Sequence, residues 1–137
     1  MRVEVVSPEQ VLFTGEATMV ITRTLGGGEI AFLPNHAPFV GALTDCDTVV
    51  HLADGKVVHV ATLGGFVEVS SNKVAILSDE AELADQIDVA AAQREREEGE
   101  AAVRADANDE RAQRRVRRAE ARLAAAGAAR GSSSAVH

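Results

Sequence analysis

The most regular set of residues that could bind a ligand lies near the C-terminal end of the chain. Arginines recur there at intervals of four, three and four residues, and two more widen the row. We call this set the basic face: Arg111, Arg114, Arg115, Arg117, Arg118 and Arg122. On a helix, side chains three and four residues apart are neighbours. Guanidinium groups bind carboxylates or phosphates but transfer no protons, because arginine stays charged. The pattern therefore predicts an anion-binding helix.

An acidic protein surface suits this basic face better than nucleic acid does. The chain has a formal net charge of −7, and only 3% of its residues are aromatic, so it offers little on which bases could stack. A free-standing β-sandwich module with a nucleic-acid-binding helix is kept as the alternative function. An arginine-rich helix that is only solvated is the third interpretation.

Residue types that could support catalysis or bind a metal do not form a recognisable set. His36 has no ligand-type residue at suitable spacing. His51 and His59 flank Asp54-Gly55, and a two-residue turn there predicts that their side chains point to opposite faces of a hairpin. The single cysteine, Cys46, has no partner and is interpreted as inert. We therefore expect a non-catalytic protein without a metal or cofactor.

The sequence GGGEIAFLPNHAP, residues 26–38, is the most constrained stretch of the chain. Its glycines are followed by a strand-like run and not by a helix, so a turn is favoured over a phosphate-binding loop. Two prolines then enclose a short loop and fix its backbone. A rigid loop without catalytic or metal-binding partners is typical of a docking surface.

The elements that position these residues fall into two parts. Residues 1–86 hold all the phenylalanines and prolines, and they break into short β-type runs separated by turn signals. Many short strands predict an antiparallel sandwich or barrel. The expected strands are 3–6, 17–25, 29–33, 39–43, 48–53, 56–63, 66–70 and 73–77.

The second part is rich in alanine, arginine and glutamate. Asp88 is expected to cap a helix from Val89 to about Glu98, which Gly99 interrupts. A second helix is expected to begin near Asn108 and to end before Gly127, which is a favourable residue after a helix. Its apolar face is mostly alanine, so it is expected to dock weakly on its own domain: Ala112, Val116, Ala119, Leu123 and Ala126. The serine-rich end is predicted to be disordered.

Charge and hydropathy limit where the protein can act. Residues 1–86 carry 12 acidic and 4 basic side chains, whereas residues 111–137 carry 7 basic and 1 acidic, which is typical of an interacting tail. The start, MRVEVVSPEQ, does not resemble a signal peptide, and no run of 18 apolar residues occurs. We expect a cytoplasmic protein that reaches a membrane only through a partner.

Four segments of the chain are distinctive when taken together: VVSPEQVLFTGEA (5–17), GEIAFLPNHAPFVGAL (28–43), GGFVEV (64–69) and VAILSDEAELADQID (74–88). They resemble the ε subunit of F-type ATP synthase, the counterpart of the mitochondrial δ subunit. The resemblance implies a β-sandwich of about ten strands over residues 1–86, a helical hairpin over residues 87–128 and a disordered tail over residues 129–137. It also implies a rotor subunit of the central stalk on the cytoplasmic face of the bacterial plasma membrane.

Partners and contact residues follow from the same resemblance. The sandwich would couple the γ subunit to the c-ring, and the hairpin would inhibit ATP hydrolysis when it extends along γ toward the α/β catalytic subunits. The implied c-ring contacts are Glu29, Ile30, Pro34, Asn35, His36 and Pro38. The implied γ contacts are Gly64, Gly65 and Phe66. The residues implied to meet an acidic segment of the catalytic β subunit are Arg111, Arg114, Arg115, Arg118 and Arg122.

One departure from the family pattern concerns nucleotide binding. Some bacterial members bind ATP through an Ile/Leu-Asp-x-x-Arg-Ala motif at the start of the first helix. Asp88 matches that motif, but Ala91 stands where the arginine would be, and Arg94 lies one turn further on. Without a guanidinium at this position to meet phosphate, we expect weak or absent ATP binding.

Overall fold

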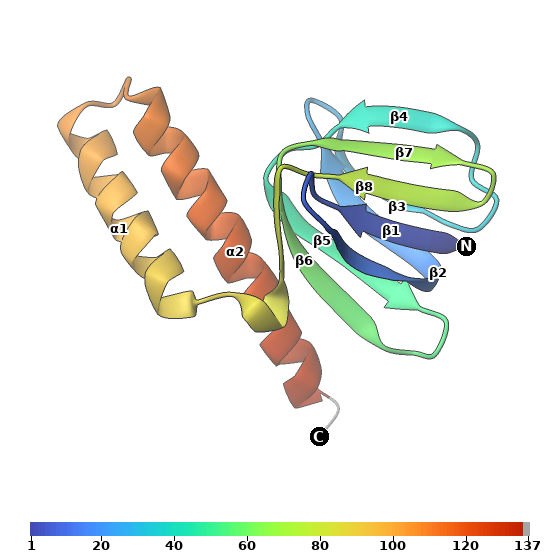
Figure 1. Ribbon diagram of the computed structural model, residues 1–137. Helices are drawn as coiled ribbons and strands as arrows, with labels where there is room; N and C mark the ends of the chain where they lie inside the picture. The colour runs from blue at the N-terminus through green and yellow to red at the C-terminus, as the bar shows by residue number, and fades with distance from the viewer. Residues whose placement is uncertain (136–137) are drawn as a thin grey trace.

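The computed structural model describes residues 1–135, which form a β-sandwich followed by two long helices (Figure 1). The predicted fold class is confirmed. A 3₁₀ turn, η1 (Ala84–Gln86), joins the sandwich to α1 (Val89–Ala105) and α2 (Glu110–Ala135). The strands are β1 (Arg2–Val6), β2 (Val11–Thr24), β3 (Gly28–Phe32), β4 (Phe39–Ala42), β5 (Cys46–Leu52), β6 (Val57–Leu63), β7 (Phe66–Ser70), β8 (Lys73–Leu77) and β9 (Glu80–Leu83).

Strand β2 belongs to both layers of the sandwich. Its first half pairs with β1 in sheet A, which runs β4-β7-β8-β1-β2. Its second half pairs with β3 and β5 in sheet B, which runs β3-β2-β5-β6-β9. The described residues therefore contain nine strands where about ten were predicted, because one strand serves twice. The sandwich is also not wholly antiparallel, since β1 and β8 pair in parallel.

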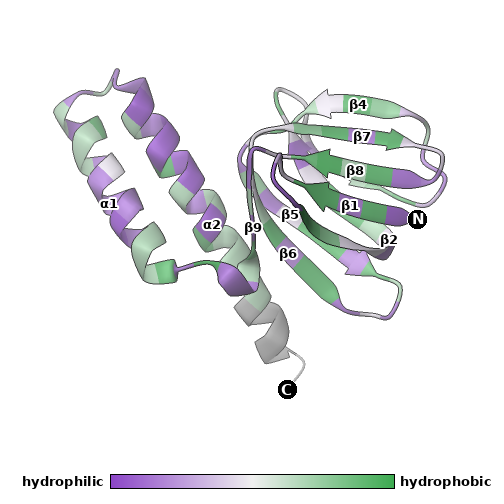
Figure 2. Ribbon diagram, viewed as in Figure 1, coloured by the Kyte–Doolittle hydropathy of each residue, from purple (hydrophilic) through white to green (hydrophobic). Residues whose placement is uncertain are grey.

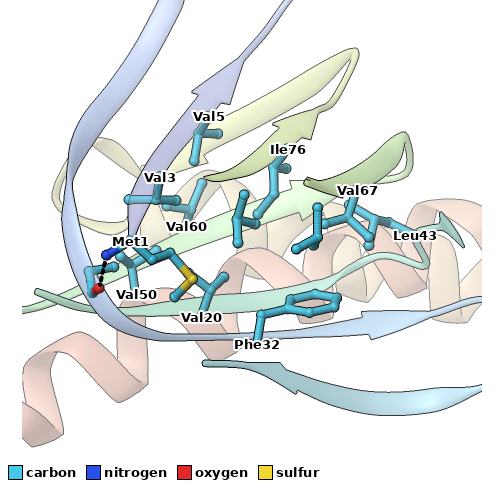
Figure 3. Packing of buried hydrophobic residues seen from close by; sticks show 13 residues of the cluster. Met1, Val3, Val5, Val20, Phe32, Leu43, Val50, Val60, Val67 and Ile76 are labelled. Carbon is cyan, nitrogen blue, oxygen red and sulfur yellow. Dashed lines mark hydrogen bonds between the residues drawn. The ribbon is translucent and has the colours of Figure 1, made fainter. Parts of the chain in front are cut away.

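The space between the two sheets is filled mainly by valine (Figure 3). Alternation along β1 and β8 points Val3, Val5, Val74 and Ile76 inward, and each is fully buried. Phe32 is the largest fully buried side chain. It comes from the end of β3, directly before the proline loop, so the core anchors that loop at its base.

Helix α2 lies between α1 and sheet B (Figure 1). Ala125 and Ala126 pack against Ala61 of β6 and Ile87 at the start of the helical segment. On the other side, α2 packs along α1. Figure 2 shows that the helices carry far more polar residues than the sandwich strands. No helix in the described part of the chain is long and apolar enough to cross a membrane.

Both predicted helix ends at glycine are wrong. Helix α1 continues through Gly99, where a Cβ atom would lie 2.8 Å from Cγ2 of Val116. This glycine serves the close approach of the two helices. Helix α2 likewise continues through Gly127, so the tail predicted to be disordered from residue 129 overlaps helix as far as Ala135. Residues 136–137 lie outside the described part.

The register of the β5–β6 hairpin also differs from the prediction. His51 pairs with Val57 and Val49 pairs with His59. The turn is a three-residue loop that ends on Gly55 at φ +91°, and Gly55 N donates to the Leu52 carbonyl. Because this shifts the pairing by one residue, His51 and His59 share one face and do not lie on opposite faces.

Candidate functional site

The loop between β3 and β4 is held in one conformation at one end of the sandwich. His36 N donates to the Leu33 carbonyl at 3.1 Å, closing a turn with Pro34 and Asn35 at its centre. Asn35 has φ +65°, which suits the third position of a type II turn. The ring of His36 stands edge-on to Phe32, with ring centroids 5.0 Å apart. Pro34, Asn35 and Pro38 are exposed on this anchored loop.

A second turn supports the loop from the side. Asn35 N donates to Oδ1 of Asn72 at 2.9 Å, and Asn72 lies in the β7–β8 turn. The backbone of Asn72 is also engaged, because its carbonyl accepts from Arg2 N at 3.1 Å. The end of the sandwich therefore consists of two coupled turns. Sequence reasoning missed Asn72, although Ser71-Asn72 between two strand-like runs was a turn signal.

The structure does not group all six predicted c-ring contact residues. Glu29 lies near the opposite end of β3 from the loop, and its Oε2 is 3.7 Å from Nη2 of Arg23. Ile30 points toward the sandwich core and is only partly accessible. The four loop residues thus form one surface, whereas Glu29 faces the region beside α2. The predicted glycine turn at 26–28 is confirmed, with Gly26 and Gly28 at positive φ in the β2–β3 hairpin.

The predicted γ contacts lie on the outer face of sheet A. Gly65 has φ +105°, and a Cβ there would come within 2.0 Å of the Leu77 carbonyl oxygen, so the position demands glycine. Phe66 follows and is 57% exposed. Pairing of β4, β7 and β8 brings two further exposed apolar side chains, Val40 and Leu77, to the same face. We call Val40, Phe66 and Leu77 the sheet A patch, which is a candidate protein-binding surface.

Ion pairs divide the arginines of the basic face into three groups. Arg115 pairs with two acids of α1: its Nε lies 2.6 Å from Oε2 of Glu95, and its Nη2 contacts Glu98. This hydrogen bond from Arg115 lowers the pKa of Glu95. Arg115 thereby joins the two helices of the hairpin to each other.

The second group joins α2 to strand β9. Nε of Arg122 lies 2.6 Å from Oε1 of Glu82, and its Nη2 lies 3.5 Å from Oε2 of Glu80. Nη1 of Arg118 lies 3.2 Å from the other oxygen of Glu80. Sequence reasoning missed β9, although the alternation Glu80-Ala81-Glu82-Leu83 has the period of a strand.

The third group is Arg111, Arg114 and Arg117, which are exposed and make no ion pair among the described residues. Arg111 and Arg114 line a cavity of about 440 Å³ together with Asp109, Arg115 and Arg118. Basic side chains dominate this cavity, so it is suited to carboxylate or phosphate ligands.

Asp88 caps α1, as predicted, and its Oδ1 accepts from Ala91 N at 3.0 Å. The aspartate therefore has a structural partner that explains its presence without a nucleotide. Ala91 occupies the first turn of the helix, where it provides no charged group. The geometry accounts for Asp88 as a helix cap.

The two histidines of the β5–β6 hairpin lie on one face of the hairpin. His59 is buried, and its Nδ1 donates to Oδ2 of Asp47 at 3.0 Å. Burial raises the pKa of the Asp47 carboxyl, and the hydrogen bond from His59 only partly offsets that effect. Among the described residues, no group of three or more potential ligands is arranged around a common point. Cys46 is free and buried.

Comparison with known proteins relates this architecture to one family. The model of "ATP synthase, Delta/Epsilon chain, beta-sandwich domain" matches residues 1–84. The ATP synthase epsilon chain of Streptomyces avermitilis is 38% identical over 128 residues, covering 93% of this chain and 96% of the relative. That of Desulfitobacterium hafniense is 43% identical over 124 residues, covering 89% and 92%.

Solved structures agree at the level of the fold. A chain in the cryo-EM structure of Euglena gracilis mitochondrial ATP synthase (OSCP/F1/c-ring) has a TM-score of 0.68 at 23% identity, covering 98% of this chain and 80% of that chain. A chain of the Tetrahymena thermophila mitochondrial ATP synthase central stalk and c-ring has a TM-score of 0.52 at 13% identity, covering 63% and 68%.

Proposed function

Because this chain belongs to the ATP synthase epsilon-chain family, we propose that it is a non-catalytic rotor subunit of a proton-translocating F-type ATP synthase. In this role it couples γ to the c-ring during ATP synthesis and restrains ATP hydrolysis through α1 and α2. The observation that carries the proposal is the relationship to epsilon chains over about nine tenths of this chain, which includes the helical hairpin as well as the sandwich.

The proposed c-ring contact is the β3–β4 loop, with Pro34, Asn35, His36 and Pro38 as its central residues. Its support is the fixed and exposed backbone, since a loop that is already ordered loses little entropy on binding. Glu29 and Ile30 remain proposed contacts outside this loop surface, since Glu29 lies near the opposite end of β3 and Ile30 points toward the core.

The proposed γ contact is the sheet A patch, together with Gly64 and Gly65, which set the start of β7. Phe66 and Val40 are exposed by 57% and 73%, and they lie on neighbouring strands of one sheet face. Burying such side chains stabilises protein interfaces, with aromatic residues contributing most.

The proposed regulatory part is the hairpin, residues 87–128, after the sandwich domain of residues 1–86. Residues 129–135, which were assigned to a tail over residues 129–137, continue α2. When the hairpin leaves the sandwich, Arg111, Arg114, Arg115, Arg118 and Arg122 would meet an acidic segment of the catalytic β subunit. The mainly alanine contact with sheet B supports reversible docking, because little apolar area is buried there.

We also propose that ATP binds weakly or not at all, because Ala91 replaces the motif arginine and Asp88 already caps α1. Titration calorimetry of the isolated chain tests this, and micromolar ATP binding would contradict it. The protein would associate with the cytoplasmic face of the bacterial plasma membrane through γ, the c-ring and the α/β subunits, without nucleic acid.

Removal of residues 89–137 tests the regulatory role. We expect the ATP synthase complex to assemble and couple normally but to hydrolyse ATP faster, since the sandwich surfaces stay intact. Hydrolysis rates are compared at equal amounts of assembled complex, with γ retention measured by co-purification. Loss of coupling, or an unchanged hydrolysis rate, would refute the inhibitory role.

A further inference from the structure

Glu80 and Glu82 of β9 form ion pairs with basic residues of α2 that are proposed to bind an acidic partner. Glu80 pairs with both Arg118 and Arg122, and Glu82 accepts a hydrogen bond from Nε of Arg122. A carboxylate of another protein would compete for the same two guanidinium groups. Docking of α2 on β9 and binding of these two arginines elsewhere therefore oppose each other.

These ion pairs add to a docking contact that is otherwise mostly alanine. The apolar contact between α2 and the sandwich involves Ala125, Ala126 and Ala61, side chains that bury little area. The side chains of Arg122 and Glu82 are only 24% and 37% exposed, so solvent screens their pair less than it screens a fully exposed one. Losing these pairs should shift the docking equilibrium measurably.

The N-terminal end of α2 is different, because its basic residues are available while the hairpin is docked. Arg111 and Arg114 are exposed, and no carboxylate among the described residues pairs with them. They line the same cavity as Arg115 and Arg118, which bear the next ion pairs along the helix. An acidic segment bound at Arg111 and Arg114 would therefore lie beside the pairs it must replace.

We propose that an acidic protein segment engages α2 in two steps, with Glu80 and Glu82 acting as its competitor within the chain. It first binds Arg111 and Arg114 on the docked hairpin. It then displaces the two glutamates from Arg118 and Arg122, which frees α2 from β9. The pairs of Arg115 with Glu95 and Glu98 lie within the hairpin, so this step does not require them to break. This inference rests on the proposed regulatory role of the hairpin.

The test uses the full chain in isolation. Spin labels at Ser70→Cys and Arg104→Cys, in a Cys46→Ser background, report the distance between sandwich and hairpin by pulsed electron resonance. We expect Glu80→Gln with Glu82→Gln to raise the ratio of undocked to docked hairpin about three- to tenfold at low salt. The matched control is Glu9→Gln with Glu97→Gln, which changes the net charge equally at exposed acids outside these pairs.

The partner is represented by a synthetic helical peptide with glutamates spaced i, i+4 along one face, and by its glutamine counterpart. We expect the glutamate peptide to bind and to increase the undocked population. Arg111→Gln with Arg114→Gln should weaken binding without changing the distances in the free protein. Glu80→Gln with Glu82→Gln should strengthen binding, because the internal competitor is gone.

Several results would overturn the proposal. These are unchanged distances in the Glu80/Glu82 variant at low salt, or equal peptide affinity in the Arg111/Arg114 variant. Tighter binding of a single-stranded oligonucleotide than of the peptide would reject an acidic protein as the partner. All of these measurements use the isolated chain. They can therefore refute this proposal without bearing on the hydrolysis rate of the truncated complex, which tests the regulatory role.

Discussion

The backbone N–H of Asn35 donates a hydrogen bond to the side-chain Oδ1 of Asn72, with the two atoms 2.9 Å apart. This bond crosses from the β3–β4 loop to the β7–β8 turn, between residues that both have positive φ. Two asparagines with left-handed backbone conformations are thus linked by a hydrogen bond at the end of the sandwich that carries the candidate docking loop.

Asn72→Ala removes this bond and places alanine at φ +59°, so we expect the free energy of unfolding to fall by about 1–3 kcal/mol. Asn72→Asp keeps an acceptor and tolerates that backbone, so it should retain most of the stability. Thermal unfolding and hydrogen exchange of the Asn35 amide are the measurements. Equal exchange of that amide in both variants would show that the bond does not order the loop.

Gly99→Ala should destabilise the hairpin by about 1–3 kcal/mol, because the added Cβ meets Val116. Gly127→Ala is the control: nothing lies within 4 Å of a Cβ there, and alanine should stabilise the helix by about 0.5–1 kcal/mol. Thermal unfolding followed by helical circular dichroism compares the two. A gain of stability in both variants would contradict the close packing at Gly99.

The pKa of Asp47 is raised by burial from its ordinary value of 3.8. A raised folded-state pKa means that the folded protein binds this proton more tightly than the unfolded chain does. The stability contributed by Asp47 is then fully present below about pH 3.8 and is lost as the pH rises through the folded-state pKa.

Asp47→Asn should therefore gain stability relative to the parent as the pH rises from acid to neutral. The comparison is made in a His59→Gln background, so that titration of the imidazole does not contribute. Chemical denaturation at several pH values measures it. A stability difference that is constant with pH would show that burial does not disfavour the Asp47 carboxylate.

Phe66→Ser should weaken binding to γ at least tenfold, since exposed aromatic side chains often dominate interfaces. Stability should change little, because Phe66 is 57% exposed. Leu25→Ser, at a comparably exposed apolar residue outside the sheet A patch, is the control and should bind γ normally. If both variants bind alike, the patch does not contact γ.

Charge reversal at Arg111 and Arg114 should raise ATP hydrolysis by the assembled complex, because the inhibited state loses its contact with an acidic segment. The effect should shrink as salt is added, since the screening length falls from about 30 Å at 0.01 M to about 8 Å at 0.15 M. Arg104→Glu on α1 is the control. Inhibition that persists unchanged at low ionic strength would argue against these contacts.

Local sequence patterns predicted elements well wherever local chemistry decides the structure. The proline loop, the glycine turn at 26–28 and the Asp88 cap depend on neighbours in the chain, and each is found as expected. The helix end predicted at a glycine was wrong where packing between two helices decides which residue is needed. Gly99 has the sequence signature of a helix end, yet a neighbouring helix, which no local pattern reveals, uses it for close approach.

Long-range pairing was the other limit. The acids Glu80 and Glu82 lie about forty residues from Arg122, so nothing in the basic face indicated them. The grouping of the predicted c-ring contacts was limited in the same way. Glu29 and His36 are close in sequence, but the extended strand β3 separates them by about 3.3 Å per residue. The β5–β6 turn is one residue longer than predicted. This shifts the register and places His51 and His59 on the same face of the hairpin, where opposite faces were predicted.

The passage of β2 through both sheets has a mechanical consequence. Two packed sheets that share no strand are held together by side-chain packing and by the loops that connect them. Here the two sheets share a strand, because β2 pairs with β1 in sheet A and with β3 and β5 in sheet B. A twisting load applied to one sheet is carried into the other along peptide bonds, and the sheets cannot separate at this edge until β2 is peeled from its neighbours.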